Sequence, residues 1–554
     1  MQLCHEQTNG CYDWSPSFSC SDGQTCENGQ CVDECPDGCS TDIDGAVAYC
    51  DGGQCVEECA FEAHDLCPAY DTCADLDNDD EHCGSCGSSC SDGEQCIDEN
   101  CVADCPSGQT YCEEVDGCVD LTSDDDHCGS CGNACPDSQS CSNSSCEQGP
   151  LDGCDPGASP FGGGEGNAVE PYRICSAVQL IRIDDSEEYL GDHYELYDHI
   201  ELDGVGFSVI GQAQGAIGDW DGGFTGVFDG NGFQIRDLEI DTPNDDYVGL
   251  FGVIDDGDLR NVELVNATIS GEENVGALVG LNEGTVLNST SSGTALISGQ
   301  ERVGGLVGHN TTDGTVDGST SAGEVQGAEQ SIGGLVGYSR GRILNSESSA
   351  NAQGNRAVGG LVGEIDSSST CLIERSKASG NIGQADEDAI NGFGGLLGMA
   401  WGYNVCEIKE SVATGDVTVP NGSRMAGFIG YIYAMELLIR DSYATGDVNG
   451  GFSAGGFLGH VANDNTWDAA EIDDSYYFGA NSSENRAFAS FPSETNIRDC
   501  RWNSDTNEDD ENSPATGLTE AEFGDVSNFS DWDFTDVWTM SDDLGRPILQ
   551  WELD

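Results

Sequence analysis

The sequence GGLVG occurs at residues 304–308, 333–337 and 359–363. Five related pentapeptides, VGLFG, GALVG, GGLLG, AGFIG and GGFLG, extend the series in both directions. The last glycines of the eight copies lie at residues 252, 280, 308, 337, 363, 398, 430 and 459, which are 26 to 35 residues apart. Repeats of this length are typical of solenoid proteins, in which each repeat is one structural unit.

A second position aligns across the repeats. A serine follows each pentapeptide from the second copy onward, at residues 289, 319, 346, 376, 411, 442 and 475, and a Val or Ile lies three residues before it. The stretches after the serine, such as SVATGDV at 411–417, alternate apolar and polar residues. Alternation with period two predicts short strands, which bury their apolar face only when successive repeats stack.

These observations predict an all-β fold, a right-handed parallel β-helix with one coil per repeat and coils about 4.8 Å apart. We expect each pentapeptide to form one buried strand per coil, its glycines allowing close backbone approach. The central residues would form an internal ladder: Leu278, Leu306, Leu335, Leu361, Leu396, Phe428 and Phe457. A phosphate-binding role for the glycines is disfavoured, because no helix start follows them and the surroundings are acidic.

The cysteines outside the N-terminal region test this register. Cys371 and Cys406 each stand five residues before the aligned serine in consecutive repeats, so stacking predicts a disulfide between them. Cys154 and Cys175 flank a segment rich in Gly and Pro and are a candidate pair. Cys500 is then left over as a free thiol, a link to the N-terminal region or an intermolecular link.

The charge balance excludes several partners. The chain has 103 Asp and Glu against 17 Lys and Arg, a formal net charge of -86. Such a chain repels nucleic acid and anionic membrane surfaces. The sequence contains no run of 18 apolar residues, so it predicts no transmembrane helix. At about 1 M salt the Debye length is only about 3 Å, which relieves self-repulsion and favours a protein adapted to brine. An acidic extracellular protein that collects divalent cations is the alternative.

Residues 1–146 hold 25 of the 30 cysteines, and 73–101 matches 118–146 at an offset of 45 with all six cysteines preserved. This density predicts a disulfide framework in an oxidising compartment. Zinc binding by the CxxC pairs beside His82 and His127 is the less favoured alternative. Calcium binding by Asp75, Asp77, Asp79, Asp120, Asp124 and Asp126 stays open. A solvated acidic loop is preferred there, since no EF-hand Gly and Glu accompany these residues. The N-terminus lacks signal-peptide character, so we expect an export signal to be missing from this numbering.

The repeat region resembles the GLUG-motif repeats of bacterial surface and secreted proteins. The resemblance includes a lead-in at 194–204 and 224–240 and an ending at 516–523 and 532–552. It implies an adhesin-like β-helical stalk or binding surface. The domains expected are cysteine-rich repeats (1–148), a linker (149–171), a lead-in or N-terminal cap (172–247), GLUG-type repeats (248–483) and a C-terminal cap (484–554). The HCGxCGxxC pattern of the first region is similar to repeats of secreted Gram-negative proteins.

No catalytic residues are predicted. The sequence has no P-loop and no H-E-x-x-H helix. His309 and His460, which directly follow a pentapeptide, are expected to face a turn. We therefore expect a non-enzymatic extracellular or cell-surface protein of a halophilic bacterium. Its expected partners are polysaccharide, a cell surface or copies of itself; no cofactor is expected, with calcium left open. The alternatives are a self-assembling fibre subunit, joined through open sheet edges, and a polysaccharide-degrading enzyme.

Overall fold

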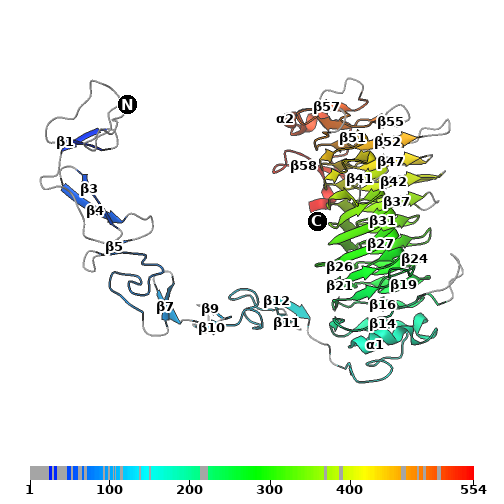
Figure 1. The fold of residues 1–554 in the computed structure, drawn as a ribbon, viewed down its shortest axis with the longest axis horizontal. Helices are drawn as coiled ribbons and strands as arrows, with labels where there is room; N and C mark the ends of the chain where they lie inside the picture. The colour runs from blue at the N-terminus through cyan, green and yellow to red at the C-terminus, as the bar shows by residue number, and fades with distance from the viewer. Residues whose placement is uncertain are drawn as a thin grey trace. The chain divides into compact units, whose positions relative to one another are not determined.

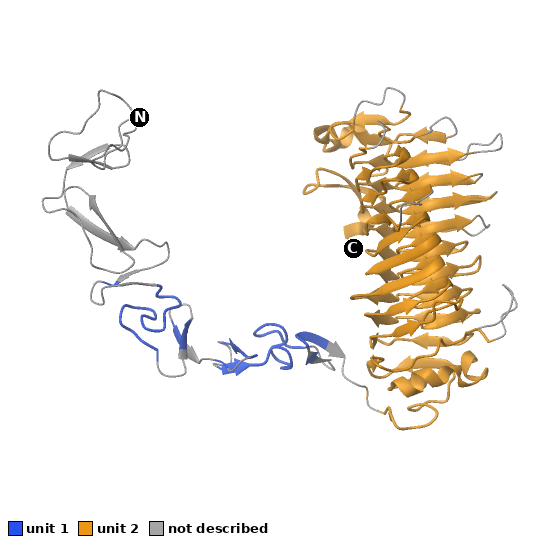
Figure 2. Cartoon of the chain, in the orientation of Figure 1, with its two compact units in different colours: residues 1–149 blue, residues 150–554 orange. Residues whose placement is uncertain are grey.

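The computed structural model divides into two compact units, residues 1–149 and 150–554, which are described separately (Figure 2). In the first unit it describes residues 24–27, 30–33, 46–51, 54–59, 65–67, 72–90, 94–97, 100–103, 105, 108–112, 117–135 and 139–148. In the second it describes residues 151, 153–212, 222–366, 371–385, 391–402, 404–433, 435–462, 470–482, 486–490, 495–507 and 513–553. None of the helices in these ranges has the length and hydropathy needed to cross a membrane.

The first unit consists of short antiparallel hairpins. The pairs are β1 (Gln24–Glu27) with β2 (Gln30–Asp33), β3 (Ala46–Asp51) with β4 (Gln54–Cys59), β5 (Asp65–Cys67) with β6 (Thr72–Ala74), β7 (Glu94–Ile97) with β8 (Asn100–Ala103), β9 (Thr110–Cys112) with β10 (Gly117–Val119), and β11 (Gln139–Ser142) with β12 (Ser145–Gln148). Strands this short bury little apolar surface, so the disulfides described below replace a large core.

The second unit is a parallel β-helix, as predicted (Figure 1). Its strands form four sheets that run along the coil axis. The first sheet extends from β13 (Tyr172–Ile174) to β55 (Thr495–Arg498), and the second extends from β15 (Ile200–Glu201) to β57 (Thr516–Leu518). Because the first sheet starts at β13, the predicted lead-in already forms stacked coils.

The other two sheets meet at the pentapeptides. The approach sheet enters each pentapeptide through β23 (Glu273–Gly276), β27 (Leu296–Gly304), β31 (Glu324–Gly333), β36 (Arg356–Gly359), β41 (Asn391–Gly394), β46 (Ser423–Ala426) and β51 (Phe452–Gly455). The pentapeptide sheet leaves it through β19 (Phe251–Ile254), β24 (Val279–Asn282), β28 (Val307–Asn310), β32 (Val336–Ser339), β37 (Val362–Asp366), β42 (Leu397–Trp401), β47 (Ile429–Tyr433) and β52 (Leu458–Ala462).

The prediction that each pentapeptide is one strand is therefore wrong. In 304–308 the first glycine ends β27, Gly305 and Leu306 form a bend, and Val307 begins β28. The motif is a corner between two sheets. Its last glycine is required by close approach, since a Cβ on Gly308 would lie 2.5 Å from the carbonyl carbon of Asn274 on the preceding coil.

Both predicted ladders are present in the core. The seven central Leu and Phe residues of the pentapeptides are fully buried, and the rings of Phe428 and Phe457 stack with centroids 4.5 Å apart. The aliphatic residues that precede the serines pair from coil to coil, for example Val316 with Ile343 and Ile343 with Ile373. One apolar residue of each kind per coil thus builds a continuous core.

The aligned serines form a ladder of hydrogen bonds. Each Oγ accepts the backbone N–H of the serine on the preceding coil, at 3.1–3.4 Å, over the six steps from Ser289 to Ser475. Each Oγ also donates to a backbone carbonyl, usually that of the residue two before it, as Ser346 does to Leu344. All seven serines are fully buried, so the ladder satisfies backbone donors that no strand partner reaches at this corner.

The ends of the unit differ from the predicted linker and cap. The segment predicted as a linker is folded from residue 153 onward, because Phe161 is buried in the main core beside α1 (Ala177–Ile181), η1 (Arg182–Asp185) and η2 (Tyr189–Gly191). Within the predicted cap, β55, β56 (Arg501–Asn503) and β57 extend the first two sheets.

The last part of the chain folds back along the side of the coils (Figure 1). It contains α2 (Glu520–Phe523), η4 (Val526–Phe529), the hairpin of β58 (Trp538–Ser541) and β59 (Arg546–Leu549), and η5 (Gln550–Leu553). Its aromatic residues pack on the outer side chains of Val412, Tyr443 and Tyr476. Glu552 accepts a hydrogen bond from Tyr443 and pairs with Lys377, so this segment braces several coils rather than one end.

Candidate functional site

Two adjoining cavities lie along the corner between the approach sheet and the pentapeptide sheet. Their volumes are about 590 and 250 Å³, and Gln330, Glu364 and Trp401 line both. We call them together the corner groove. The larger cavity is also lined by Arg356, Asn391, Met399, Arg424, Tyr431 and Tyr433, and the smaller by Tyr247, Asn274, Arg302, Ser331, His309, Tyr338 and Arg340.

One side of the groove is a ladder of side chains from the pentapeptide sheet. The residue directly after each pentapeptide pairs with its equivalent on the next coil, in the order His309, Tyr338, Glu364, Met399, Tyr431 and His460. Two positions further along, Trp401 pairs with Tyr433. His309 and His460 therefore lie within strands, and the prediction that they face a turn is wrong.

The other side comes from the approach sheet, where one residue per coil has a left-handed backbone. Asn274, Arg302, Ser331 and Arg424 have φ of 57°, 55°, 63° and 59°. A left-handed residue interrupts the alternation of a strand, so neighbouring side chains can face the same side. Gln330 and Ser331 both line the groove although they are consecutive in the sequence.

Four of the arginines line the groove, and they fall into two kinds. Arg302 pairs with Glu273 at 2.9 Å, and Arg340 Nε lies 3.5 Å from Asp366. Arg356 instead donates to Gln330 Oε1 at 2.7 Å, and the Arg424 guanidinium lies 4.3 Å from the centre of the Tyr431 ring. Within the described residues, neither Arg356 nor Arg424 forms an ion pair with a carboxylate.

Burial shifts the pKa values of several groups in the groove. Burial raises the pKa of Glu364, whose Oε2 accepts a hydrogen bond of 2.7 Å from Ser331 Oγ. Burial, together with Arg302 and Arg340, lowers the pKa of His309 to about 3, so this imidazole is neutral at ordinary pH. The Tyr338 hydroxyl donates to Asp366 Oδ2 at 3.1 Å, and burial raises the pKa of this hydroxyl.

Several polar atoms that line the groove make no hydrogen bond within the described residues. They are Asn274 Oδ1, His309 Nε2 and Asn391 Oδ1, and the residues Asn274 and His309 are only 2% and 6% exposed. A buried polar atom left without a partner costs about 1–3 kcal/mol. Groups of a bound molecule, or ordered water, would satisfy these atoms.

Comparison with known proteins identifies the repeat. A family model described as the GLUG motif matches residues 299–326, which contain the pentapeptide at 304–308, His309 of the groove and Ser319 of the ladder. The chain carries a GLUG motif at residues 299–326. The resemblance inferred from the sequence is thus confirmed for this segment.

Two curated relatives are similar to parts of the chain. Halomucin of Haloquadratum walsbyi is 39% identical over 141 residues, 24% of this chain and 2% of that protein. A putative Gly-rich membrane protein of Evansella cellulosilytica is 37% identical over 137 residues, 24% of this chain and 15% of that protein. The chain thus matches only a small part of each. A solved structure of a putative immunoglobulin A1 protease from Bacteroides ovatus covers 71% of this chain and 95% of its own, at 16% identity and a TM-score of 0.34, too low to support an argument.

Disulfides stabilise the predicted cysteine-rich modules of the first unit, as the described residues show. Cys83 is bonded to Cys96 and Cys90 to Cys101, and the equivalent bonds recur 45 residues later, from Cys128 to Cys141 and from Cys135 to Cys146. The pair Cys67–Cys86 recurs as Cys112–Cys131, and Cys105 is bonded to Cys118.

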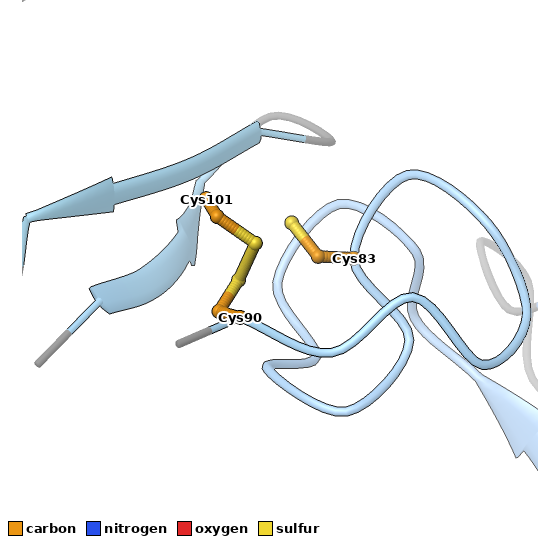
Figure 3. Close-up of side chains that lie close together, drawn as sticks. All are labelled: Cys83, Cys90 and Cys101. Atoms are coloured by element: carbon orange, nitrogen blue, oxygen red, sulfur yellow. A yellow bond between two sulfur atoms is a disulfide. The ribbon is translucent and has the colours of Figure 1, made fainter. Parts of the chain in front are cut away.

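The zinc alternative does not fit these modules. Cys83, Cys90 and Cys101 lie close together, but Figure 3 shows the sulfurs of Cys90 and Cys101 joined, and Cys83 is bonded to Cys96. His82 and His127 use Nδ1 to accept the backbone N–H of Gly87 and Gly132. Disulfide sulfurs are not thiolate ligands, so the clusters are structural.

The calcium candidates stabilise turns in the described structure. Asp75 and Asp79 accept the backbone N–H two residues ahead, as do Asp120 and Asp124 in the second module. Thr122 lowers the pKa of Asp120 by hydrogen bonding. In the described part of the chain, Asp77 and Asp126 are not gathered with them into a cluster with metal-ligand spacing.

Four of the five cysteines of the second unit form the two predicted disulfides. Cys371 is bonded to Cys406, with Cα atoms 5.0 Å apart, and Cys154 to Cys175. Cys500 is a free thiol that is 1% exposed and lies near the carbonyl of Arg498, so an intermolecular link would require unfolding.

Sequence reasoning located the coils but not the groove. The available signal was the residue after each pentapeptide of the GLUG repeats, which changes from Leu281 in the second copy to His, Tyr, Glu, Met, Tyr and His in the later ones. The change from Leu to His, Tyr and Glu at one position of successive coils is the sequence signal of the groove.

Proposed function

We propose that this chain is a non-enzymatic extracellular surface protein that binds polysaccharide through the corner groove. The observation that carries the proposal is the association of exposed aromatic rings with polar atoms that lack partners. Trp401 is 39% exposed beside Tyr433, and Asn391 Oδ1 lies in the same cavity without a hydrogen bond to any described residue. Sugar rings offer apolar faces that stack on aromatic side chains and hydroxyls that pair with amides.

The shape of the groove also supports a polymer as the ligand. The GLUG coils repeat their groove residues along one axis, and neighbouring strands are about 4.8 Å apart. A linear chain lying along this axis meets new side chains at each coil. A compact ligand would use only part of the series from His309 to His460.

The cellular setting follows from composition and similarity. A disulfide framework requires an oxidising compartment, so we place the protein outside the cytoplasm. The net charge of -86 and the similarity to halomucin of Haloquadratum walsbyi support a high-salt habitat. The similarity to a protein named as a putative Gly-rich membrane protein supports a position at the cell surface.

The absence of catalysis is part of the proposal. Hydrolysis of a glycosidic bond needs one carboxyl group as acid and another as base or nucleophile. Asp366, which contacts the lining residues Tyr338 and Arg340, accepts a hydrogen bond from the first and pairs with the second, while Glu364 in the groove accepts from Ser331. These contacts support structural roles for both carboxyl groups. Cleavage of the bound polymer is the alternative, favoured only by the closeness of these two groups to the groove.

Both functions can be tested in one experiment. The full chain in 2–4 M NaCl is titrated with soluble polysaccharides, and the products are analysed for new reducing ends. We expect saturable binding without product, and a loss of about tenfold in affinity for Trp401→Ala. Leu544→Ala, an exposed apolar residue of the fold-back segment, is the control and should bind normally. Release of oligosaccharides that stops in Asp366→Asn would refute the non-enzymatic proposal.

A further inference from the structure

We infer that the larger cavity of the corner groove selects an anionic sugar residue, carboxylated or sulfated, held by Arg356 and Arg424 while its ring lies against Trp401 and Tyr433. This inference rests on the proposed function and adds the charge of the ligand. It runs against the overall charge of the chain, which by itself would repel an acidic polymer.

Positively charged side chains are scarce in this chain. The chain has 17 Lys and Arg, of which two are lysines, so 15 are arginines. Elsewhere on the coils, arginines commonly bridge carboxylates on adjacent coils, as Arg260 does with Asp229 and Arg375 with Glu410. Arg356 and Arg424 lie at the larger cavity and form no ion pair within the described residues, although the charge of Arg356 acts on the carboxyl group of Glu364 in the same lining. Acidic residues are abundant in the chain, which has 103 of them, yet these two guanidinium groups remain available to bind an anionic ligand.

The larger cavity is locally positive. Its lining contains these two arginines and a single carboxyl group, that of Glu364. Ser331 Oγ donates to Glu364, and burial raises the pKa of this group, so the neutral form is favoured further up the pH scale than for an ordinary glutamate. The charge that an anionic ligand meets inside the cavity therefore has the opposite sign to that of the surrounding surface.

The two arginines are also spaced for an extended ligand. Arg356 is on β36 and Arg424 on β46, two coils apart, which corresponds to about 10 Å. Asn391 lies on β41 between them, and its Oδ1 has no hydrogen bond within the described residues. Trp401 and Tyr433 extend from the opposite sheet. A sugar chain along the axis would contact cation, amide and cation on one side and aromatic rings on the other.

Each guanidinium keeps donors available for an anion. Arg424 lies over the face of Tyr431, an arrangement that leaves the N–H groups at the edge of the guanidinium plane. Arg356 uses Nη1 for Gln330, and its Nη2 lies 3.9 Å from Met399 Sδ, a weak acceptor that an anion would readily replace. Guanidinium groups pair well with carboxylate and sulfate oxygens because they offer parallel donors.

The experiment measures selectivity on the full chain at 2–4 M NaCl by isothermal titration calorimetry. The probes are an oligogalacturonate, the same oligosaccharide with its carboxyl groups reduced to alcohols, and a sulfated galactan oligosaccharide of equal length. We expect at least one anionic probe to bind about tenfold or more tightly than the neutral one, since hydrogen bonds to charged groups are the stronger kind. The better of the two anionic probes identifies the natural anion.

Substitutions separate recognition from packing. Arg356→Gln and Arg424→Gln should each lower affinity for the preferred anionic probe by about five- to tenfold and leave affinity for the neutral probe within about twofold. Arg342→Gln, an exposed arginine of the first sheet outside the groove, is the matched control. A purely structural role would lower the melting temperature of both groove variants and leave the selectivity unchanged.

The possible results separate the anionic character of the ligand from polysaccharide binding itself. Equal binding of the three probes, with no selective effect of either arginine substitution, would overturn the anionic ligand while leaving polysaccharide binding intact. If no probe binds and Trp401→Ala matches the unmodified protein, the proposed function fails and this inference fails with it. Selective loss in Arg356→Gln and Arg424→Gln supports both.

Discussion

Replacing Ser346 by Ala removes one step of the buried serine ladder. Ser346 Oγ accepts the N–H of Ser319 at 3.1 Å and donates to the carbonyl of Leu344 at 2.6 Å. The carbonyl keeps a second donor, the N–H of Gly318 at 3.0 Å, but the fully buried Ser319 loses the acceptor of its N–H. An orphaned buried donor costs about 1–3 kcal/mol, so we expect Ser346→Ala to lower the free energy of unfolding by about 2 kcal/mol.

The measurement is urea unfolding at a fixed 2 M NaCl, with hydrogen exchange of the Ser319 amide as the local readout. Ser349→Ala is the matched control, because this serine is exposed and donates only to the carbonyl of Ser321 at 3.3 Å. Its cost should stay below about 0.5 kcal/mol. Equal urea midpoints for the two variants, together with unchanged exchange at Ser319, would show that the ladder does not contribute to stability as argued.

Three further results are expected. Replacing both Cys371 and Cys406 by Ser should destabilise the second unit by about 2–4 kcal/mol in urea, because the bond closes residues 35 apart; an unchanged midpoint would contradict this. Burial and neighbouring aspartates raise the pKa of Asp474 from 3.8 to about 7, so the folded state loses stability as pH rises through this range. Asp474→Asn should therefore increase the free energy of unfolding by about 1–2 kcal/mol at pH 8 and leave it unchanged at about pH 3.5. Melting temperatures at the two pH values measure the difference. Glu364→Gln should bind anionic oligosaccharides about threefold more tightly above the raised pKa of Glu364, where the native carboxyl group is ionised, and no difference there would refute the charge argument.

The core could be predicted because its apolar residues recur at fixed positions of every repeat. A Leu or Phe at one fixed position of each pentapeptide, and a Val or Ile before each serine, allow only a stacked arrangement that buries both series. The disulfide between Cys371 and Cys406 follows from the same register. What spacing could not reveal was the bend within the pentapeptide, since a corner and a short strand both place its Leu in the core and its glycines against another backbone.

The groove was not predictable from the sequence, because it depends on backbone conformation at residues with no common type. The left-handed positions of its approach side include Asn274, Arg302 and Ser331, and of these only Asn favours that region. The roles of Arg356 and Arg424 depend on which carboxylates lie near them, and that requires knowing how the coils stack. Similarly, the cap prediction could not show that the chain returns along Tyr443 and Tyr476.

The serine ladder and the apolar ladders take one residue of each kind from every coil. This regularity affects how the number of repeats can change in evolution. Each ladder step joins adjacent coils, so duplication or loss of a complete repeat outside the coils that the fold-back segment contacts would leave every remaining step in place. The change would lengthen or shorten the corner groove by about 4.8 Å. Copy number would then act as a ruler for the length of ligand that can be held, and avidity could grow by recombination of repeats while the residues of each coil stay the same.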